Sequence, residues 1–108
     1  MKIGNIQLKH GLLLAPMAGV TDRTYRRICR ENGAEYTVTE MVSANAIHYH
    51  DRKTDELARL YDGERPAAIQ LFGRDAATLA EAAVHLCEAF HPDVIDLNIP
   101  MRAGQKRI

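Results

Sequence analysis

The segment PAAIQLFGRDAATLAEAAVHLCEAFHPDVIDLNI, residues 66–99, contains a complete strand–helix–strand unit. The apolar run at residues 66–73 predicts a buried strand, and residues 76–90 repeat apolar side chains at helical spacing. Pro92 ends this helix because proline cannot continue it, and residues 93–99 predict the second strand. Five side chains are expected on the apolar face of the helix: Leu79, Ala83, Leu86, Cys87 and Phe90.

The same alternation extends toward the N-terminus. Strands are predicted at residues 11–17 and 35–41, the first followed by a helix over residues 22–32 and the second by helical propensity around residues 53–61. A short hairpin is predicted at residues 2–9. The strand centres are about 24 to 31 residues apart, the size of one strand–helix unit, so the sequence predicts a parallel sheet covered by helices.

The predicted fold class is α/β, and two architectures fit it. The first is a partial TIM (β/α)8 barrel, containing about the first four βα units after a small N-terminal β-hairpin. The second is an open, doubly wound sheet. A dinucleotide-binding sheet of that kind would carry a glycine-rich GxGxxG turn after its first strand, whereas this turn reads APMAGVTD, residues 15–22. The partial barrel is therefore favoured.

Composition limits the classes of function. The chain has 108 residues, about one small domain, and its 46% hydrophobic and 26% charged residues are typical of globular proteins rather than disordered ones. A formal net charge of +0 gives no general attraction to nucleic acid or to an anionic membrane. No apolar run approaches the roughly 20 residues that would span a bilayer, and the N-terminus does not resemble a signal peptide.

The two cysteines indicate a reducing compartment. Cys29 and Cys87 form no CxxC pair, and without a secretory signal a disulfide or a zinc framework is not expected. Both are predicted to be small buried or half-buried residues, in a cytoplasmic protein.

Three of the predicted strands end on polar residues that a purely apolar core would not contain: Glu40, Gln70 and Asn98. In barrels the C-terminal ends of the strands form the active site, so these side chains are expected to converge on one mouth. Gln70 and Asn98 are expected at the same level of neighbouring strands, where they would suit a flat heterocycle such as a flavin or a pyrimidine. The alternative is that each amide only satisfies backbone groups of its loop.

Two other patterns carry less weight. His48 and His50 form an HxH pair without an obvious third ligand, so no metal site is predicted. Four arginines recur along the helix over residues 22–32 and are interpreted as a solvated basic face rather than an RNA site: Arg23, Arg26, Arg27 and Arg30.

The combination of LAPMAGVTDRTYRRICRENGAEYTVTEMVSANAI, IQLFGRD and DVIDLNI resembles the N-terminal half of bacterial tRNA-dihydrouridine synthases, over residues 1–99. The resemblance implies a flavin-dependent oxidoreductase on a TIM barrel. Such an enzyme reduces the C5–C6 double bond of selected uridines in tRNA, with FMN as cofactor and NADPH as reductant. It also implies tRNA as the partner, bound with the target base flipped out of its stack.

The resemblance assigns roles to individual residues. Pro16, Met17 and Ala18 match the turn that lies against the FMN ring, and Gln70 matches a glutamine that hydrogen-bonds the flavin. Asn98 matches the asparagine that faces the substrate uracil. Glu40 matches a further position in the same pocket, without a defined role.

The chain departs from the family pattern after Ile99. Family members continue with Gly-Cys-Pro, whose cysteine protonates C5 of the uracil, but this chain continues directly with Pro100. Residues 100–108 are therefore interpreted as a divergent tail without a catalytic residue. The second half of the barrel, with its phosphate-binding loops, is not in the sequence, so the isolated chain is expected to be inactive and to self-associate through its open sheet.

Two other functions stay open. The chain could be a truncated remnant or a half-barrel module that assembles with another half. It could also resemble flavin enzymes of free pyrimidines, the dihydroorotate dehydrogenases, which use related turns after the first strand. The TEM and DLN motifs argue against the latter.

Overall fold

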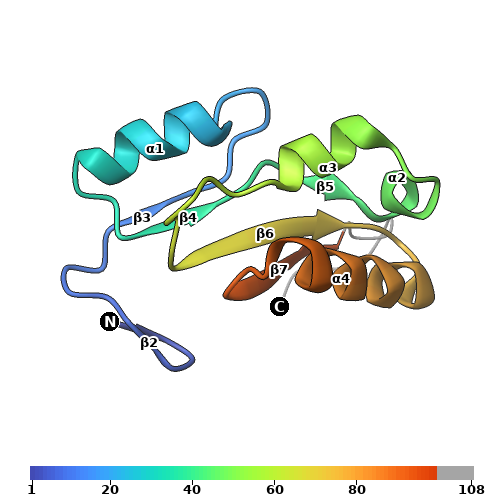
Figure 1. Cartoon of the computed structure of the whole chain (residues 1–108). Coiled ribbons are helices and arrows are strands. Elements are labelled where there is room, and N and C mark those ends of the chain that lie inside the picture. Colours follow the sequence, from blue (N-terminus) through green and yellow to red (C-terminus); the bar gives the residue numbers. More distant parts are fainter. Residues whose placement is uncertain (100–108) are drawn as a thin grey trace, which may run out of the picture.

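The fold was analysed in a computed structural model, which describes residues 1–99. One parallel sheet carries the helices, and a small antiparallel hairpin lies near one end of the sheet (Figure 1). The sheet contains β3 (Leu13–Leu14), β4 (Tyr36–Val38), β5 (Val42–Ser43), β6 (Ala67–Phe72) and β7 (Val94–Asn98). The predicted tail at residues 100–108 lies outside the described residues.

Strand β6 is the centre of the sheet. It pairs in parallel with β7 along residues 68–72, with β4 near its start and with β5 near its end. Because β7 occupies one edge of β6, β4 and β5 share the other edge, and β3 follows beyond β4. Successive strands are thus neighbours, as in part of a TIM barrel, and no closed barrel is formed by residues 1–99.

The predicted parallel sheet is confirmed, with two differences in strand length. The strand predicted at residues 11–17 pairs only at Leu13 and Leu14. The strand predicted at residues 35–41 forms only β4, and β5 begins at Val42, just beyond the predicted end. The Thr39 hydroxyl accepts a hydrogen bond from the backbone N–H of Gln70, at 3.2 Å, in place of a backbone carbonyl.

The helices begin at side-chain caps. They are α1 (Arg23–Glu31), α2 (Ala44–His48), α3 (Arg52–Ala58) and α4 (Ala76–Phe90), and their N-cap side chains accept hydrogen bonds from first-turn N–H groups. The N-caps are Asp22, Ser43, Asp51 and Asp75. Gly33, with φ +111°, follows α1 where the sequence predicted the helix to stop. Among residues 1–99, no helix combines the length and apolar character needed to cross a membrane.

The main core lies between the sheet and helices α2, α3 and α4. Ile69 and Leu71 of β6 contribute to it, and α4 buries Leu79, Ala82 and Leu86 against it. The predicted apolar face of α4 is therefore largely correct, and Ala83 and Phe90 are partly buried beside this core. Cys87 was wrongly assigned to this face, because it is exposed, whereas Cys29 is half-buried as expected.

The opposite face of the sheet, called the inner face, is covered at its base by the hairpin of β1 (Lys2–Ile3) and β2 (Ile6–Gln7). Leu8 follows this hairpin and is buried with three side chains from β4 and β6: Tyr36, Val38 and Ala68. Val94 of β7 is partly buried against them. The hairpin therefore packs on the amino-terminal end of the inner face and leaves the carboxyl ends of the strands free of it.

A buried ion pair connects α1 to the segment before β6. Arg26 is 0% exposed and Glu64 is 1% exposed. The Arg26 guanidinium donates two hydrogen bonds to the Glu64 carboxylate, at 2.7 and 3.1 Å, and further bonds to the backbone carbonyls of Thr21 and Arg59. The Thr37 hydroxyl of β4 donates to the same carboxylate at 2.6 Å.

These contacts correct the predicted solvated basic face of α1. Arg26 is fully buried, and Arg30 turns toward the sheet, where it donates to the Thr37 hydroxyl and to the carbonyls of Arg65 and Pro66. Only Arg23 and Arg27 pair with carboxylates at the surface. Helical spacing of like charges could not reveal this, because the partner Glu64 lies 38 residues away in the sequence.

Tyr36 lies at the base of the inner face, and its environment favours the neutral phenol. Burial raises the pKa of Tyr36 above its ordinary value of 10.0, and the negative charges of Asp96 and Asp93 raise this pKa further. A folded-state pKa above the unfolded value gives stability that is fully present below pH 10.0 and lost as the pH rises through the raised pKa.

We predict that Glu64→Gln lowers the free energy of unfolding by about 3–5 kcal/mol, because it leaves the Arg26 guanidinium buried without its counter-charge. Urea denaturation followed by circular dichroism would measure the change. The matched control is Glu56→Gln, which breaks the exposed Arg23–Glu56 pair of 3.0 Å and should cost about 1 kcal/mol or less. Equal, small losses in both variants would contradict a central role for the buried pair.

We also predict that Tyr36→Phe reduces the loss of stability as the pH rises above 10.0, because the variant has no buried phenol to ionise. Thermal melts across that pH range would measure it. Tyr49→Phe, at a tyrosine that is 79% exposed, is the control and should leave the pH dependence unchanged. An identical alkaline loss in the Tyr36 variant and the parent chain would refute the assignment.

Candidate functional site

The carboxyl ends of the parallel strands lie at one edge of the sheet, here called the mouth, where the sequence predicts that the site residues converge. Glu40 follows β4, Gln70 lies in β6 and Asn98 ends β7. The predicted level of the two amides was wrong. Gln70 lies opposite Asp96, and Asn98 lies opposite Phe72, two residue pairs closer to the mouth.

Gln70 is paired with a carboxylate that the sequence analysis did not select. Its Nε2 donates a hydrogen bond to Oδ2 of Asp96 at 2.7 Å, between half-buried side chains on the inner face. The alternation of polar residues in residues 93–99 placed Asp96 on the same face as Asn98, but the strand register was needed to identify its partner.

The turn after β3 is held by hydrogen bonds at both ends. The Thr21 hydroxyl accepts from the Met17 N–H at 3.0 Å, and the Met17 carbonyl accepts from the N–H groups of Val20 and Thr21. Gly19 has φ +76°, a conformation that favours glycine. Within this turn Pro16 is half-buried, whereas Met17 and Ala18 are exposed. An apolar side chain, Met17, is thus available beside the strand ends.

Glu40, which follows β4, connects this turn to the end of that strand. Its Oε1 accepts a hydrogen bond from the backbone N–H of Gly19, so the carboxylate fixes the turn that contains Met17. The chain therefore brings together Glu40 and the turn predicted to lie against a flavin. Glu40 contributes a structural contact here that the sequence pattern did not define.

Asn98 has a weaker partner. Its Nδ2 lies 3.0 Å from Sδ of Met41, and a thioether sulfur is a poor acceptor. The Asn98 side chain is exposed at the end of β7, so its carbonyl and its amide hydrogens are accessible from the mouth. A side chain with both donors and an acceptor can recognise a heterocycle that presents both kinds of group along one edge.

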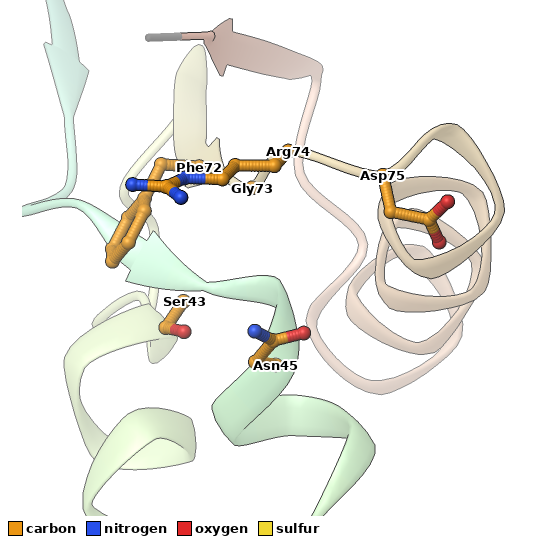
Figure 2. A pocket seen from close by; sticks show the side chains of 6 residues that line it. All are labelled: Ser43, Asn45, Phe72, Gly73, Arg74 and Asp75. Carbon is orange, nitrogen blue, oxygen red and sulfur yellow. The ribbon is translucent and has the colours of Figure 1, made fainter.

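A pocket of about 360 Å³ opens next to the ends of β5 and β6 (Figure 2). It is lined by Ser43, Asn45, Phe72, Gly73, Arg74 and Asp75. Gly73 is required by close packing, because an added Cβ would lie 3.0 Å from Cδ2 of Leu79 and 3.1 Å from Cβ of Ala44. Since Phe72 pairs with Asn98, this pocket borders the mouth. No pattern in the sequence pointed to this pocket.

The described residues contain no group of three or more histidine, cysteine or acidic side chains placed to hold a metal ion. His48, half of the HxH pair, lies 3.2 Å from the exposed Glu81 carboxylate instead.

The arrangement was compared with known proteins. The family model described as Dihydrouridine synthase (Dus) matches residues 13–104, which include every strand of the parallel sheet. The chain is 43% identical over 100 residues to tRNA-dihydrouridine synthase B of Pseudomonas aeruginosa, covering 92% of this chain and 30% of that relative. It is 41% identical over 111 residues to tRNA-dihydrouridine synthase B of Vibrio parahaemolyticus, covering 100% of this chain and 34% of the relative.

A third relative, the probable tRNA-dihydrouridine synthase of Treponema pallidum, is 38% identical over 98 residues, covering 91% of this chain and 29% of the relative. The chain thus spans about a third of the length of the curated relatives it matches. The match extends over most of its own length and over all the strand ends of the mouth. The chain therefore belongs to the dihydrouridine synthase family.

Proposed function

We propose that this chain supplies part of the mouth of a barrel that reduces the C5–C6 bond of uridine in tRNA, with FMN as cofactor and NAD(P)H as reductant. The observation that carries the proposal is the arrangement of three motif strand ends. Glu40, Gln70 and Asn98 belong to the TEM, QLFG and DLN motifs. Glu40 follows β4, Gln70 lies in β6 and Asn98 ends β7, and β6 pairs in parallel with both β4 and β7. The relatives named tRNA-dihydrouridine synthase B contain the matching segment.

The side chains at the mouth fit a flavin in chemistry. Met17 is 41% exposed and provides an apolar surface for a ring face, with Pro16 and Ala18 on either side of it. Gln70 offers amide hydrogen-bonding groups to the polar edge of the ring, and it is held by Asp96. When bound, FMN would supply hydride transfer to the uracil. These residues would bind and orient the ring.

Asn98 and Glu40 are proposed to face the substrate. Asn98 lies two residue pairs beyond Gln70 toward the mouth, which suits contact with a base stacked above a ring that Gln70 binds. Glu40 is committed to the Gly19 N–H through one oxygen, so it would act mainly by holding the turn beside the base. A uridine in tRNA would have to leave its stack to reach these groups.

Protonation of C5 needs a general acid, and the family motif's Gly-Cys is absent from the sequence after Ile99. Cys29 and Cys87 belong to α1 and α4, and they cannot replace it because the helices pack on the outer side of the sheet. We therefore propose that the 108-residue chain is inactive by itself and that catalysis requires the acid and the remaining strands of a longer barrel.

A second candidate function is a half-barrel module that assembles with another chain. Within residues 1–99 no strand pairs with the outer edge of β7, and Leu97 and Ile99 at this edge are 51% and 59% exposed. An open parallel edge with exposed apolar side chains favours association. The proposal that the chain acts on free pyrimidines has no comparable support, since the relatives named above are tRNA enzymes by name.

The proposed reaction can be tested with a chimera. Residues 1–99 would replace the matching segment of the Pseudomonas aeruginosa relative, so that its own downstream sequence follows Ile99. We predict that the chimera restores dihydrouridine in the tRNA of a strain lacking such synthases, measured by mass spectrometry of nucleosides. The purified 108-residue chain, given FMN, NADPH and the same tRNA, should form none.

Asn98→Ala in the chimera should lower the yield at least about tenfold, since it removes the group proposed to contact the base. Lys53→Ala, at an exposed residue of α3, is the matched control. A chimera that binds FMN and folds, yet leaves tRNA unmodified, would refute the proposed substrate.

We predict that the 108-residue chain self-associates through β7 and that Leu97→Lys shifts it toward the monomer, because a charged edge opposes strand pairing. Sedimentation at several concentrations would measure this. Leu57→Lys, on α3, is the control and should not change the distribution. A monomeric parent chain at all concentrations would exclude the module.

A further inference from the structure

We propose that Asp96 is a positioning residue that fixes the amide of Gln70, so that the Gln70 carbonyl oxygen faces the ligand and the site selects a ring with an imide N–H. This inference rests on the proposed function, because it takes the ligand to be a flat heterocycle at the mouth. It deepens that function by naming the residue that sets which edge of the heterocycle is accepted.

The strand pairing places the two side chains together. Strands β6 and β7 are parallel partners over five successive residue pairs, and Gln70 is directly opposite Asp96. Gln70 and Asp96 follow the inner-face pair of buried Ala68 and partly buried Val94 by two positions, so they lie on the same inner face, above the covered base. Both are half-buried. Their relative position is therefore set by the backbone of the sheet rather than by flexible loops.

The chemistry of the pair then determines the amide orientation. The oxygen and nitrogen of a glutamine amide have similar shapes, so their assignment has to follow from the partners. An ionised carboxylate can only accept hydrogen bonds, and Oδ2 of Asp96 lies 2.7 Å from the Gln70 amide. The nitrogen must occupy this position, because the reversed amide would bring two acceptor oxygens to the same distance.

The fixed orientation leaves the Gln70 carbonyl oxygen as the hydrogen-bond acceptor for the ligand. With Nε2 committed to Asp96, Oε1 occupies the other branch of the amide, and the described residues donate no hydrogen bond to it. A ligand atom that meets Oε1 must be a donor. A ring N–H between two carbonyls, as in the imide edge of a flavin or of uracil, satisfies this condition, whereas a ring that presents a second acceptor leaves two unpaired polar groups.

An asparagine at position 96 would remove this constraint. It could offer either its oxygen or its nitrogen to Gln70, so both orientations of the Gln70 amide would become available with nearly the same shape of the site. Asp96→Asn is therefore the variant that separates an orienting role from a packing role.

The orientation can be tested without a ligand. In a nitrogen-15 spectrum of the 108-residue chain, the side-chain amide signals of Gln70 would be identified by their loss in Gln70→Leu. We expect one amide proton to be shifted downfield and slowed in exchange by its bond to Asp96, and we expect this shift to disappear in Asp96→Asn. Ordinary, fast-exchanging signals in the parent chain would overturn the proposal, and this holds even if the variant fails to fold.

The selectivity is tested by two titrations of the parent chain and Asp96→Asn. The first compares FMN with N3-methyl-FMN and is followed by flavin fluorescence. The second compares uridine monophosphate with its N3-methyl form and is followed by the amide spectra. Methylation removes only the imide donor. We expect the parent chain to prefer the unmethylated member of one pair by about tenfold or more, and the variant to reduce this preference several-fold. A preference for FMN over N3-methyl-FMN would identify a flavin as the source of the imide, and a preference for uridine monophosphate over its N3-methyl form would identify a uracil.

An unchanged preference in the variant would overturn the selective role of Asp96. Failure of the parent chain to bind any of the four probes would overturn the imide site and the proposed cofactor site together. The amide spectrum would still decide separately whether Asp96 orients Gln70.

Discussion

The buried pair of Arg26 and Glu64 is the constraint on which the other contacts of the sheet depend. A charge with no access to water must find its partners within the fold, and Arg26 bonds to the Glu64 carboxylate and to the backbone carbonyls of Thr21 and Arg59. The pair connects the start of α1, the segment before β6 and, through Thr37, strand β4. Because Thr21 both accepts Met17 N–H and contributes its carbonyl to Arg26, the same network holds the turn at the mouth.

The mouth is thus built on two supports of different kinds. The turn containing Met17 is held by a local contact from Thr21 and by a contact from Glu40 to Gly19, 21 residues earlier in the sequence. Gln70 and Asp96 are held by the regular pairing of two strands. The first support depends on a few hydrogen bonds, whereas the second depends on the sheet as a whole. These two kinds of support suit a site in which the turn contacts the face of a flat ring and the strands contact the edge of that ring.

The sequence predicted the elements well where one pattern decided them. Residues 76–90 form α4 as their apolar spacing and Pro92 indicated, and residues 66–73 and 93–99 form strands of a parallel sheet. The motifs also predicted the family. The failures concern pairings between distant residues: Arg26 with Glu64, Gln70 with Asp96, and Thr39 with the backbone of Gln70. Local spacing contains no information on register or on a buried counter-charge, so these contacts needed the structure.

The central position of β6 has a consequence for synthesis of the chain on the ribosome. The backbone N–H of Gln70 bonds to a hydroxyl 31 residues earlier, and the Gln70 side chain bonds to a carboxylate 26 residues later. When β6 emerges, its earlier partners are already present, but its second edge stays unpaired until β7 has been translated. Non-local parallel pairing of this kind is slow, and the unpaired edge of β6 is meanwhile a target for chaperones and for aggregation. The pace of translation between Gly73 and Asp93 is therefore part of how this sheet reaches its final form.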